Sequence, residues 1–262
     1  MIDEKTLMQN SYKFQDIRQM EKDYLLTLLL YEIYNEFNDE LIFKGWTSLK
    51  YFYNLNRFSE DLDFSYLDSK KSLNSIYSKM NKAFKHFNLQ YDIIKSEHRE
   101  YKEGDSIVGI NFELRIKGPL FDKLNHMENI DIDISLRNDV TSHPDIKYLV
   151  PSYTDIPTFP VPVMNLNEIL SEKVAAITER DKMRDIYDLY FLIKFYNLKP
   201  DIILINQKFQ MRGEKFNVTD FLSNINSALN SAKWKEELSF LINPVPDINE
   251  VVKIINVAFQ DI

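Results

Sequence analysis

The sequence contains no cysteine and has only five glycines in 262 residues. A chain without cysteine cannot form a disulfide framework, a thiol nucleophile or a cysteine-based zinc site. The few glycines, together with nine prolines, exclude fibrous and low-complexity proteins. The four histidines have no metal-ligand spacing, and there is no phosphate-binding loop or nucleophile elbow. These absences disfavour zinc proteases, P-loop NTPases and α/β-hydrolases.

Long apolar segments are absent as well. No apolar run approaches the roughly 20 residues that a membrane-spanning helix needs. The N-terminal residues, MIDEKTLMQN, lack the basic start and the apolar core of a secretory signal. We therefore expect a cytoplasmic protein that has no membrane partner.

Acidic residues outnumber basic ones, and the formal net charge is −8. Such a charge argues against non-specific adhesion to nucleic acid, which is itself a polyanion. The segment 68–102 nevertheless has an excess of lysine and arginine, and Lys79, Lys82 and Lys85 recur there at helical spacing. This segment predicts a local basic surface, with an ordinary solvated helix face as the alternative.

Periodicity divides the first part of the chain into helices and strands. Helical spacing of apolar residues is found over 14–38, 47–53 and 73–87. Short apolar or alternating segments predict strands at 41–43, 62–66, 91–95, 110–116 and 130–136. The last two segments alternate apolar with polar residues, which is typical of a strand with one buried and one solvated face. The order predicts a small mixed α/β domain.

The composition changes at residues 151–163, PSYTDIPTFPVPV, where four prolines favour extended backbone and end any helix. Beyond them the pattern is helical. Asn165 with Glu168 resembles a capping box, and Asp247 with Glu250 marks a further helix start. We predict an α+β protein with a mixed-sheet domain over 1–150, a proline-rich linker over 151–163 and a helical domain over 164–262.

Two acids lie at alternate positions where the predicted strand 62–66 begins. Asp61 and Asp63 are separated by one residue, so their side chains project to the same face. Two carboxylates this close repel each other unless a cation lies between them, and Mg²⁺ favours carboxylates together with substrate phosphates. Asp131 and Asp133 repeat this spacing on another predicted strand. A third carboxylate from there would complete a two-metal site for phosphoryl or nucleotidyl transfer. Acids at the solvated end of a strand are the alternative.

A strand, a glycine turn, a helix and a strand with Asp-x-Asp together resemble the DNA polymerase beta-like nucleotidyltransferases. The fuller segments KGWTSL (44–49) and RFSEDLDF (57–64) are similar to the first motif of the AbiEii-type toxins. In the second half, EKVAAITERDKMRDIYDLYFL (172–192) is similar to the helix pair of the same family. The sequence departs from the family at Trp46, where a small residue is usual. A bulky indole at this position is expected to reshape the nucleotide pocket.

The resemblance implies a role for each matching residue. Asp61, Asp63 and Asp133 would be metal ligands for Mg²⁺ or Mn²⁺, and Asp185 or Asp188 would be an essential acid. Asp133 is preferred to Asp131 because Ile-Ser follows it. The residues expected to bind the NTP substrate are Gly45, Thr47, Ser48, Arg57, Ser59, Lys173 and Arg184.

Lys173 is expected to contact the triphosphate. For Arg184 with Asp188, a helix-surface ion pair is the alternative, because the two residues are four apart. For Arg57 and Ser59, the alternative is that they only shape the turn before the acids.

The resemblance further implies a Mg-dependent nucleotidyltransferase toxin of a toxin–antitoxin or abortive-infection system, with a cognate antitoxin as a partner. Its acceptor is expected to be RNA, such as a tRNA 3′ end. There are two alternatives. The chain would attach the nucleotide to a protein side chain, or it would be a catalytically inactive nucleotide-binding protein with the same fold.

Overall fold

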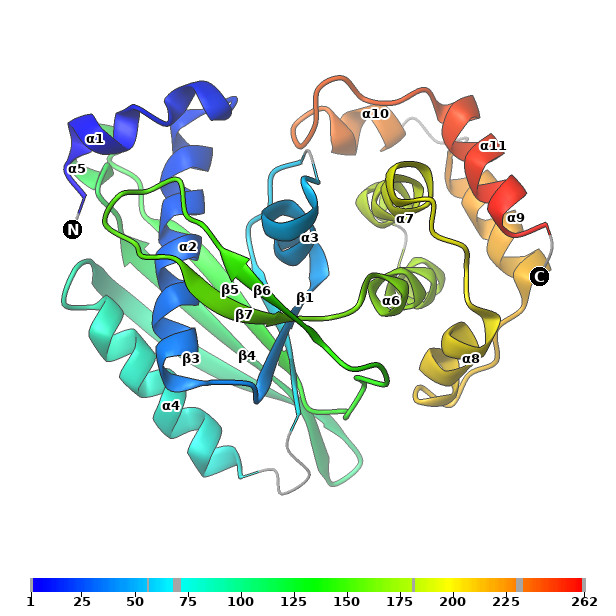
Figure 1. Cartoon of the computed structure of the whole chain (residues 1–262), viewed down its shortest axis with the longest axis horizontal. Helices are drawn as coiled ribbons and strands as arrows, with labels where there is room; N and C mark the ends of the chain where they lie inside the picture. Colours follow the sequence, from blue (N-terminus) through cyan, green and yellow to red (C-terminus); the bar gives the residue numbers. More distant parts are fainter. Residues whose placement is uncertain (1, 56, 68–71, 181, 230–232, 261–262) are drawn as a thin grey trace. The chain divides into compact units, whose positions relative to one another are not determined.

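The structure of the protein is a computed structural model that describes residues 2–55, 57–67, 72–180, 182–229 and 233–260. Contacts within the chain define two compact units, whose elements are labelled in Figure 1. Unit 1 contains Met1–Tyr53, Ser59–Asn138 and Pro144–Val163, and unit 2 contains Asn54–Phe58, Asp139–His143 and Met164–Ile262. Two short segments, Asn54–Phe58 and Asp139–His143, therefore interrupt unit 1 in sequence and belong to unit 2.

Unit 1 is built around a mixed sheet, which in the described residues has the strand order β3-β4-β5-β2-β1-β7-β6. The strands are β1 (Leu41–Lys44), β2 (Leu62–Tyr66), β3 (Asp92–Glu103), β4 (Ser106–Lys117), β5 (Glu128–Ser135), β6 (Asp145–Leu149) and β7 (Phe159–Val163). The helical segments are α1 (Glu4–Met8), the 3₁₀ turn η1 (Ser11–Lys13), α2 (Ile17–Glu36), α3 (Gly45–Tyr53), α4 (Leu73–Phe87) and α5 (Phe121–Leu124). The central strands β2 and β5 are parallel, whereas β1 pairs antiparallel with β2.

One face of this sheet forms the apolar core of unit 1. Helices α2 and α4 cover that face (Figure 1). The ring of Phe84 on α4 lies 5.6 Å from Phe112 on β4, and Tyr34 on α2 lies 6.1 Å from Phe64 on β2. Burial of each such side chain contributes about 1.5–3 kcal/mol. Because side chains alternate along a strand, the polar residues between these aromatic positions point to the opposite face.

Unit 2 is helical. Its helices are α6 (Leu166–Glu179), α7 (Met183–Tyr196), α8 (Ile202–Gln210), α9 (Val218–Leu229), α10 (Lys233–Leu238) and α11 (Ile248–Ala258). Helix α7 contacts α6, α9, α10 and α11, so most of its side chains are buried. Polar residues in the first two turns of α7 are therefore enclosed by other helices rather than exposed to solvent. Among the helices of the described residues, none has the length and apolar character needed to cross a bilayer.

The predicted α+β class, with a mixed sheet followed by helices, is confirmed. The segment predicted as a linker differs, because Phe159–Val163 forms β7, which pairs with β1 and β6. Proline favours extended backbone, and that conformation suits a strand as well as a linker. Of the capping box predicted for Asn165 and Glu168, only Asn165 caps the helix. Asn165 accepts a hydrogen bond from the backbone N of Asn167 at 3.0 Å, but Glu168 accepts from Thr141 and Ser142 instead.

Candidate active site

A row of polar side chains crosses the face of the unit 1 sheet that is opposite to α2 and α4. Asp63 on β2 is directly opposite Asp133 on the parallel strand β5. The row extends to Lys44 on β1 and to Asn111 on β4. Residues opposite each other on neighbouring strands share a face, so these four side chains lie side by side. Asp61, which precedes β2 by one residue, adds a third carboxylate beside the row. We call Asp61, Asp63 and Asp133 the acid row.

The acids in this row repel one another. Burial, and after it the charge of Asp63, raises the pKa of Asp61 to about 7. The same two causes raise the pKa of Asp133 to about 6, although Nδ2 of Asn111 donates a hydrogen bond of 3.1 Å to Oδ1 of Asp133. The acid row is therefore a site at which negative charge is only partly compensated by the protein. A cation or a proton bound there would relieve the repulsion.

Gly45 holds the backbone close to the acid row. Its φ is +68°, a left-handed value that favours glycine, and a Cβ atom at this position would lie 2.1 Å from Oδ2 of Asp63. No other residue could approach the carboxylate in this way without moving it. The glycine that the sequence comparison singled out is therefore required by contact with Asp63 as well as by the turn.

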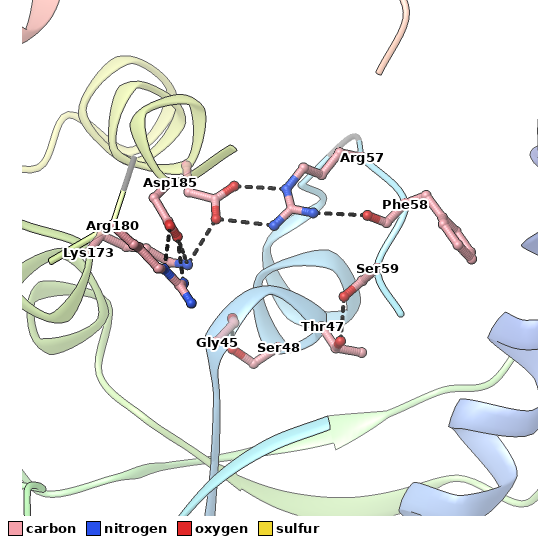
Figure 2. A network of polar contacts seen from close by, with 10 residues as sticks. Gly45, Thr47, Ser48, Arg57, Phe58, Ser59, Lys173, Arg180 and Asp185 are labelled. Carbon is pink, nitrogen blue, oxygen red and sulfur yellow. Dashed lines mark hydrogen bonds and ion pairs between the residues drawn. The ribbon is translucent and has the colours of Figure 1, made fainter. Parts of the chain in front are cut away.

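The hydroxyl groups near this glycine bind within the turn. Oγ1 of Thr47 is 2.6 Å from Oγ of Ser59 (Figure 2). The same Oγ1 donates to the backbone carbonyl of Asp61. Oγ of Ser48 donates to the carbonyl of Gly45 at 2.7 Å. Thr47, Ser48 and Ser59 are all buried. In this structure they position the backbone that carries Asp61, and their binding of a triphosphate stays a prediction.

Unit 2 contains a separate network of charged groups, which Figure 2 shows around Asp185. Nζ of Lys173 lies 3.1 Å from Oδ1 of Asp185 and 3.0 Å from Oδ2 of Asp188. Arg57 donates from Nε and Nη2 to the two carboxylate oxygens of Asp188, at 3.0 and 3.3 Å. Arg180 binds Asp185 in the same two-pronged manner, at 2.9 and 3.1 Å. We call these five residues the charge network.

The charge network is compensated, in contrast to the acid row. Burial alone would raise the pKa of Asp185, but Lys173 and Arg180 outweigh it and hold this pKa below its usual value. Arg180 is the member that reaches solvent, because 42% of its side chain is exposed while those of Arg57 and Lys173 are buried.

Comparison with known proteins decides what kind of protein carries these features. Residues 28–259 match a family model described as the nucleotidyl transferase AbiEii toxin of a type IV toxin–antitoxin system. The chain belongs to the AbiEii family. The resemblance predicted from the two sequence motifs is thus confirmed, and the protein is a nucleotidyltransferase toxin of a toxin–antitoxin system, with a nucleotide as substrate and a cognate antitoxin implied.

Solved structures show the same fold as this AbiEii protein. JHP933 from Helicobacter pylori has 20% sequence identity and a TM-score of 0.55, with 94% of this chain and 91% of that chain covered. MenT4, a nucleotidyltransferase toxin from Mycobacterium tuberculosis, has 18% identity and a TM-score of 0.58, with 100% and 91% covered. Among curated proteins, none matches the sequence.

The donor chemistry of the acid row in this AbiEii protein suits a hard divalent cation. Its three side chains are carboxylates, which Mg²⁺ and Mn²⁺ prefer, and the pKa values of Asp61 and Asp133 are raised by burial and then by the charge of Asp63. Within the described residues, no three Asp, Glu, His or Cys side chains already stand in the geometry of a metal site. The ligand set predicted from the sequence therefore fits a divalent cation by the chemistry of its donors, and metal binding stays a prediction.

The structure also shows the surroundings of the other residues that the sequence analysis named. Asp188 is fully buried and bound by Arg57 and Lys173, so it is not part of a helix-surface ion pair. The sequence predicts that Arg57 and Lys173 bind the NTP. In the structure both side chains are bound to carboxylates of the charge network. Arg184, in the first turn of α7, acts on Arg57 through its charge. Trp46 is buried in the first turn of α3.

Two of the three lysines on the basic face predicted on α4 lie close to acids. Lys79 forms an ion pair with Glu40, and Nζ of Lys82 lies 3.9 Å from Glu36. His86 lies 3.7 Å from the same Glu36. Residues 68–71, which belong to the predicted basic segment, lie outside the described residues. Lys79 and Lys82 thus have acidic neighbours, and binding of a polyanion by α4 stays a prediction.

Sequence reasoning missed Lys44, Asn111 and Arg180. Lys44 directly precedes the glycine turn, and Arg180 lies within the second family motif, so both were within reach of the motif comparison. Asn111 had no such signal, because only the pairing of β4 with β5 brings it to Asp133.

Proposed function

We propose that this AbiEii-family toxin transfers a nucleotide from an NTP to RNA, such as the 3′ end of a tRNA, with Mg²⁺ or Mn²⁺ as its metal. The observation that carries the proposal is the acid row. Asp63 and Asp133 are opposite each other on parallel strands, and Asp61 and Asp133 have pKa values of about 7 and about 6. Perturbed carboxylates gathered at one place are typical of catalytic sites.

The residues of the acid row would hold the metal. A bound divalent cation lowers the pKa of an acceptor hydroxyl and stabilises the departing pyrophosphate. The chain supplies the orientation of the ligands. Pairing of β2 with β5 sets Asp63 beside Asp133, Asn111 orients Asp133 by its hydrogen bond, and Thr47 fixes the backbone of Asp61.

The charge network supports binding of the triphosphate. Positive groups stabilise the charge that develops in phosphoryl transfer. Arg180 is 42% exposed, whereas Lys173 is buried between two acids. Within unit 2, Arg180 is therefore the member of the charge network that is exposed for contact with a phosphate. Lys173 adds its charge and holds Asp185 and Asp188 in place.

Incubation of the purified protein with each radiolabelled NTP, Mg²⁺ or Mn²⁺, and total RNA or total protein tests this function. The expected result is label in the RNA fraction that depends on metal and is absent with Asp63→Asn. Label in protein alone would overturn the RNA acceptor in favour of protein modification. NTP binding without transfer to either fraction would identify a nucleotide-binding protein that has lost catalysis.

A further inference from the structure

The polar face of the unit 1 sheet continues beyond the acid row. Asp133 on β5 is opposite Asn111 on β4, and Asn111 is opposite Arg99 on β3. In the adjacent row, Ser135 on β5 is opposite Gly109, and Gly109 is opposite Tyr101 on β3. Residues in adjacent rows on one face are about 7 Å apart along the strands. Tyr101 is therefore on the same face as Asp133, one row further along.

The ring of Tyr101 lies against Gly109. A Cβ atom at Gly109 would be 3.2 Å from Cδ2 of Tyr101, so the missing side chain makes room for the ring. The ladder is also irregular here, because pairing jumps from Tyr101 with Gly109 to Lys102 with Ile107. A β-bulge of this kind re-aims the neighbouring side chain, and bulges are frequent beside active sites. The ring rests on backbone on one side, and Tyr101 is 50% exposed.

The groups around Tyr101 are mainly carboxylates. Burial, and after it the charge of Asp133, raises the pKa of Tyr101, which indicates that the phenol lies within electrostatic reach of the acid row. Arg99 is nearby, but its Nη2 is 2.8 Å from Oε1 of Glu113, so its charge is balanced. An exposed aromatic ring among carboxylates suits a nucleoside better than a phosphate. The base stacks on the ring, and ribose hydroxyls donate to carboxylates.

The strand order places the groups suited to the NTP phosphates and those suited to the acceptor on opposite sides of Asp63. Lys44 and the Gly45 turn lie on the β1 side of Asp63, where a cation and close backbone suit phosphates. Asp133, β4 and β3 lie on the other side. The acceptor hydroxyl needs a carboxylate beside it and an end of the strand held in place. The acceptor therefore approaches from the β3 and β4 side.

We infer that Tyr101, resting on Gly109, is the stacking residue for the terminal nucleoside of the acceptor strand and sets the hydroxyl of that nucleoside beside Asp133. This inference rests on the proposed function in one respect, namely that the acceptor is RNA. Tyr101 on β3 would select the acceptor through its aromatic ring, and its phenol hydroxyl would not be needed.

Three variants test the role of the ring. Tyr101→Ala is expected to raise KM for the RNA acceptor about tenfold, which is within the range that stacking of one base contributes, and to leave KM for the NTP unchanged. Tyr101→Phe keeps the ring and should behave like wild type. The matched control is Tyr148→Ala, which removes a 68% exposed tyrosine from β6 at the far end of the strand order. RNA labelling that is equal in Tyr101→Ala and wild type overturns the inference and leaves RNA transfer intact.

A second measurement does not require catalysis. Tyr101→Trp places a fluorophore on β3, and stacking of a single-stranded RNA oligonucleotide on it should quench fluorescence beyond the change seen in wild type, which contains Trp46 and Trp234. If label goes to protein and not to RNA, the proposed acceptor is wrong. Quenching of Tyr101→Trp by the oligonucleotide would then still support nucleoside stacking here, and its absence would overturn it.

Discussion

Unit 1 and unit 2 both bury carboxylates, but the pKa values of Asp61 and Asp133 in unit 1 and those of Asp185 and Glu168 in unit 2 shift in opposite directions. In unit 1, burial and a neighbouring acid raise the pKa values of Asp61 and Asp133. In unit 2, Asp185 and Glu168 are buried completely, yet their pKa values are lowered, because the effect of nearby cations exceeds that of burial.

The difference teaches that depth of burial does not identify the site of chemistry. A buried carboxylate that is bound by cations and backbone N–H groups holds parts of a structure together. Glu168 is an example, because it accepts from Thr141, Ser142 and Lys208 and so ties the segment Asp139–His143 to the helices of unit 2. A carboxylate kept beside others of its own charge has unused capacity to bind a cation.

Replacement of one acid in the acid row should have the largest effect, and it concerns activity. Asp63→Asn is expected to lower nucleotide transfer about 1,000-fold, equivalent to roughly 4 kcal/mol of activation free energy. The melting temperature in metal-free buffer should stay constant or rise, because one source of repulsion is removed. Transfer assays and thermal melting check this. The exposed Asp145→Asn on β6 is the control. A fall in melting temperature of more than about 5 °C would indicate a structural ion pair instead.

The corresponding change in the charge network should affect stability. Asp188→Ala leaves Arg57 and Lys173 buried without this carboxylate, which costs about 3–5 kcal/mol and lowers the melting temperature by roughly 10 °C. Thermal melting measures the loss. The control is Asp188→Leu combined with Arg57→Met, which replaces an ion pair by apolar groups and should recover part of the stability. If Asp188→Ala melts at the temperature of wild type, the charge network does not contribute to stability.

The two units also differ in how their stability should depend on pH, and two fully buried glutamates, Glu21 in unit 1 and Glu168 in unit 2, test this difference. Burial raises the pKa of Glu21 to about 7 from a usual 4.5, so the folded protein keeps a proton that the unfolded chain loses. The stability contribution of Glu21 therefore falls as pH rises from about 4.5 to 7. Between pH 5 and 8, the unfolding free energy of wild type relative to Glu21→Gln should fall by roughly 2–3 kcal/mol.

Glu168 is the matched residue in unit 2. Its pKa is lowered, so its contribution is present above about 4.5 and is lost only as pH falls through the lower folded value. Urea unfolding at pH 5 and 8 should therefore give a constant difference between wild type and Glu168→Gln. Equal pH dependence of the two glutamine variants would contradict the distinction between the units.

The smallest expected effect comes from two glycines with positive φ. Gly45→Ala and Gly104→Ala each place a side chain in the left-handed region, at φ +68° and +58°, which costs about 1–2 kcal/mol. Only at Gly45 does the new Cβ meet Asp63, since no atom lies within 4 Å of a Cβ at Gly104. Gly45→Ala should lose more stability than Gly104→Ala, because its Cβ must displace Asp63. Transfer activity should fall in Gly45→Ala alone, and melting and transfer assays check both expectations. Full activity in Gly45→Ala would show that Asp63 tolerates displacement.

The sequence by itself determined several elements of unit 1 and the acids at the start of β2. Alternation predicted β4 and β5, helical spacing predicted α2 and α4, and Asp61 with Asp63 followed from side-chain alternation at the start of β2. These features are local, because the periods of 2.0 and 3.6 residues arise from backbone geometry within one segment. The family motifs added Asp133 because they record positions that act together.

Tertiary structure alone decided which groups meet. Arg57 and Asp188 are 131 positions apart in the chain, and Tyr101 reaches Gly109 only through the register of β3 with β4. A shift of that register by one residue would turn every side chain to the other face of the sheet. Local periodicity carries no information on register or on the partner of a buried charge. Both are set by packing of segments far apart in the chain, where apolar burial and charge compensation must be satisfied together.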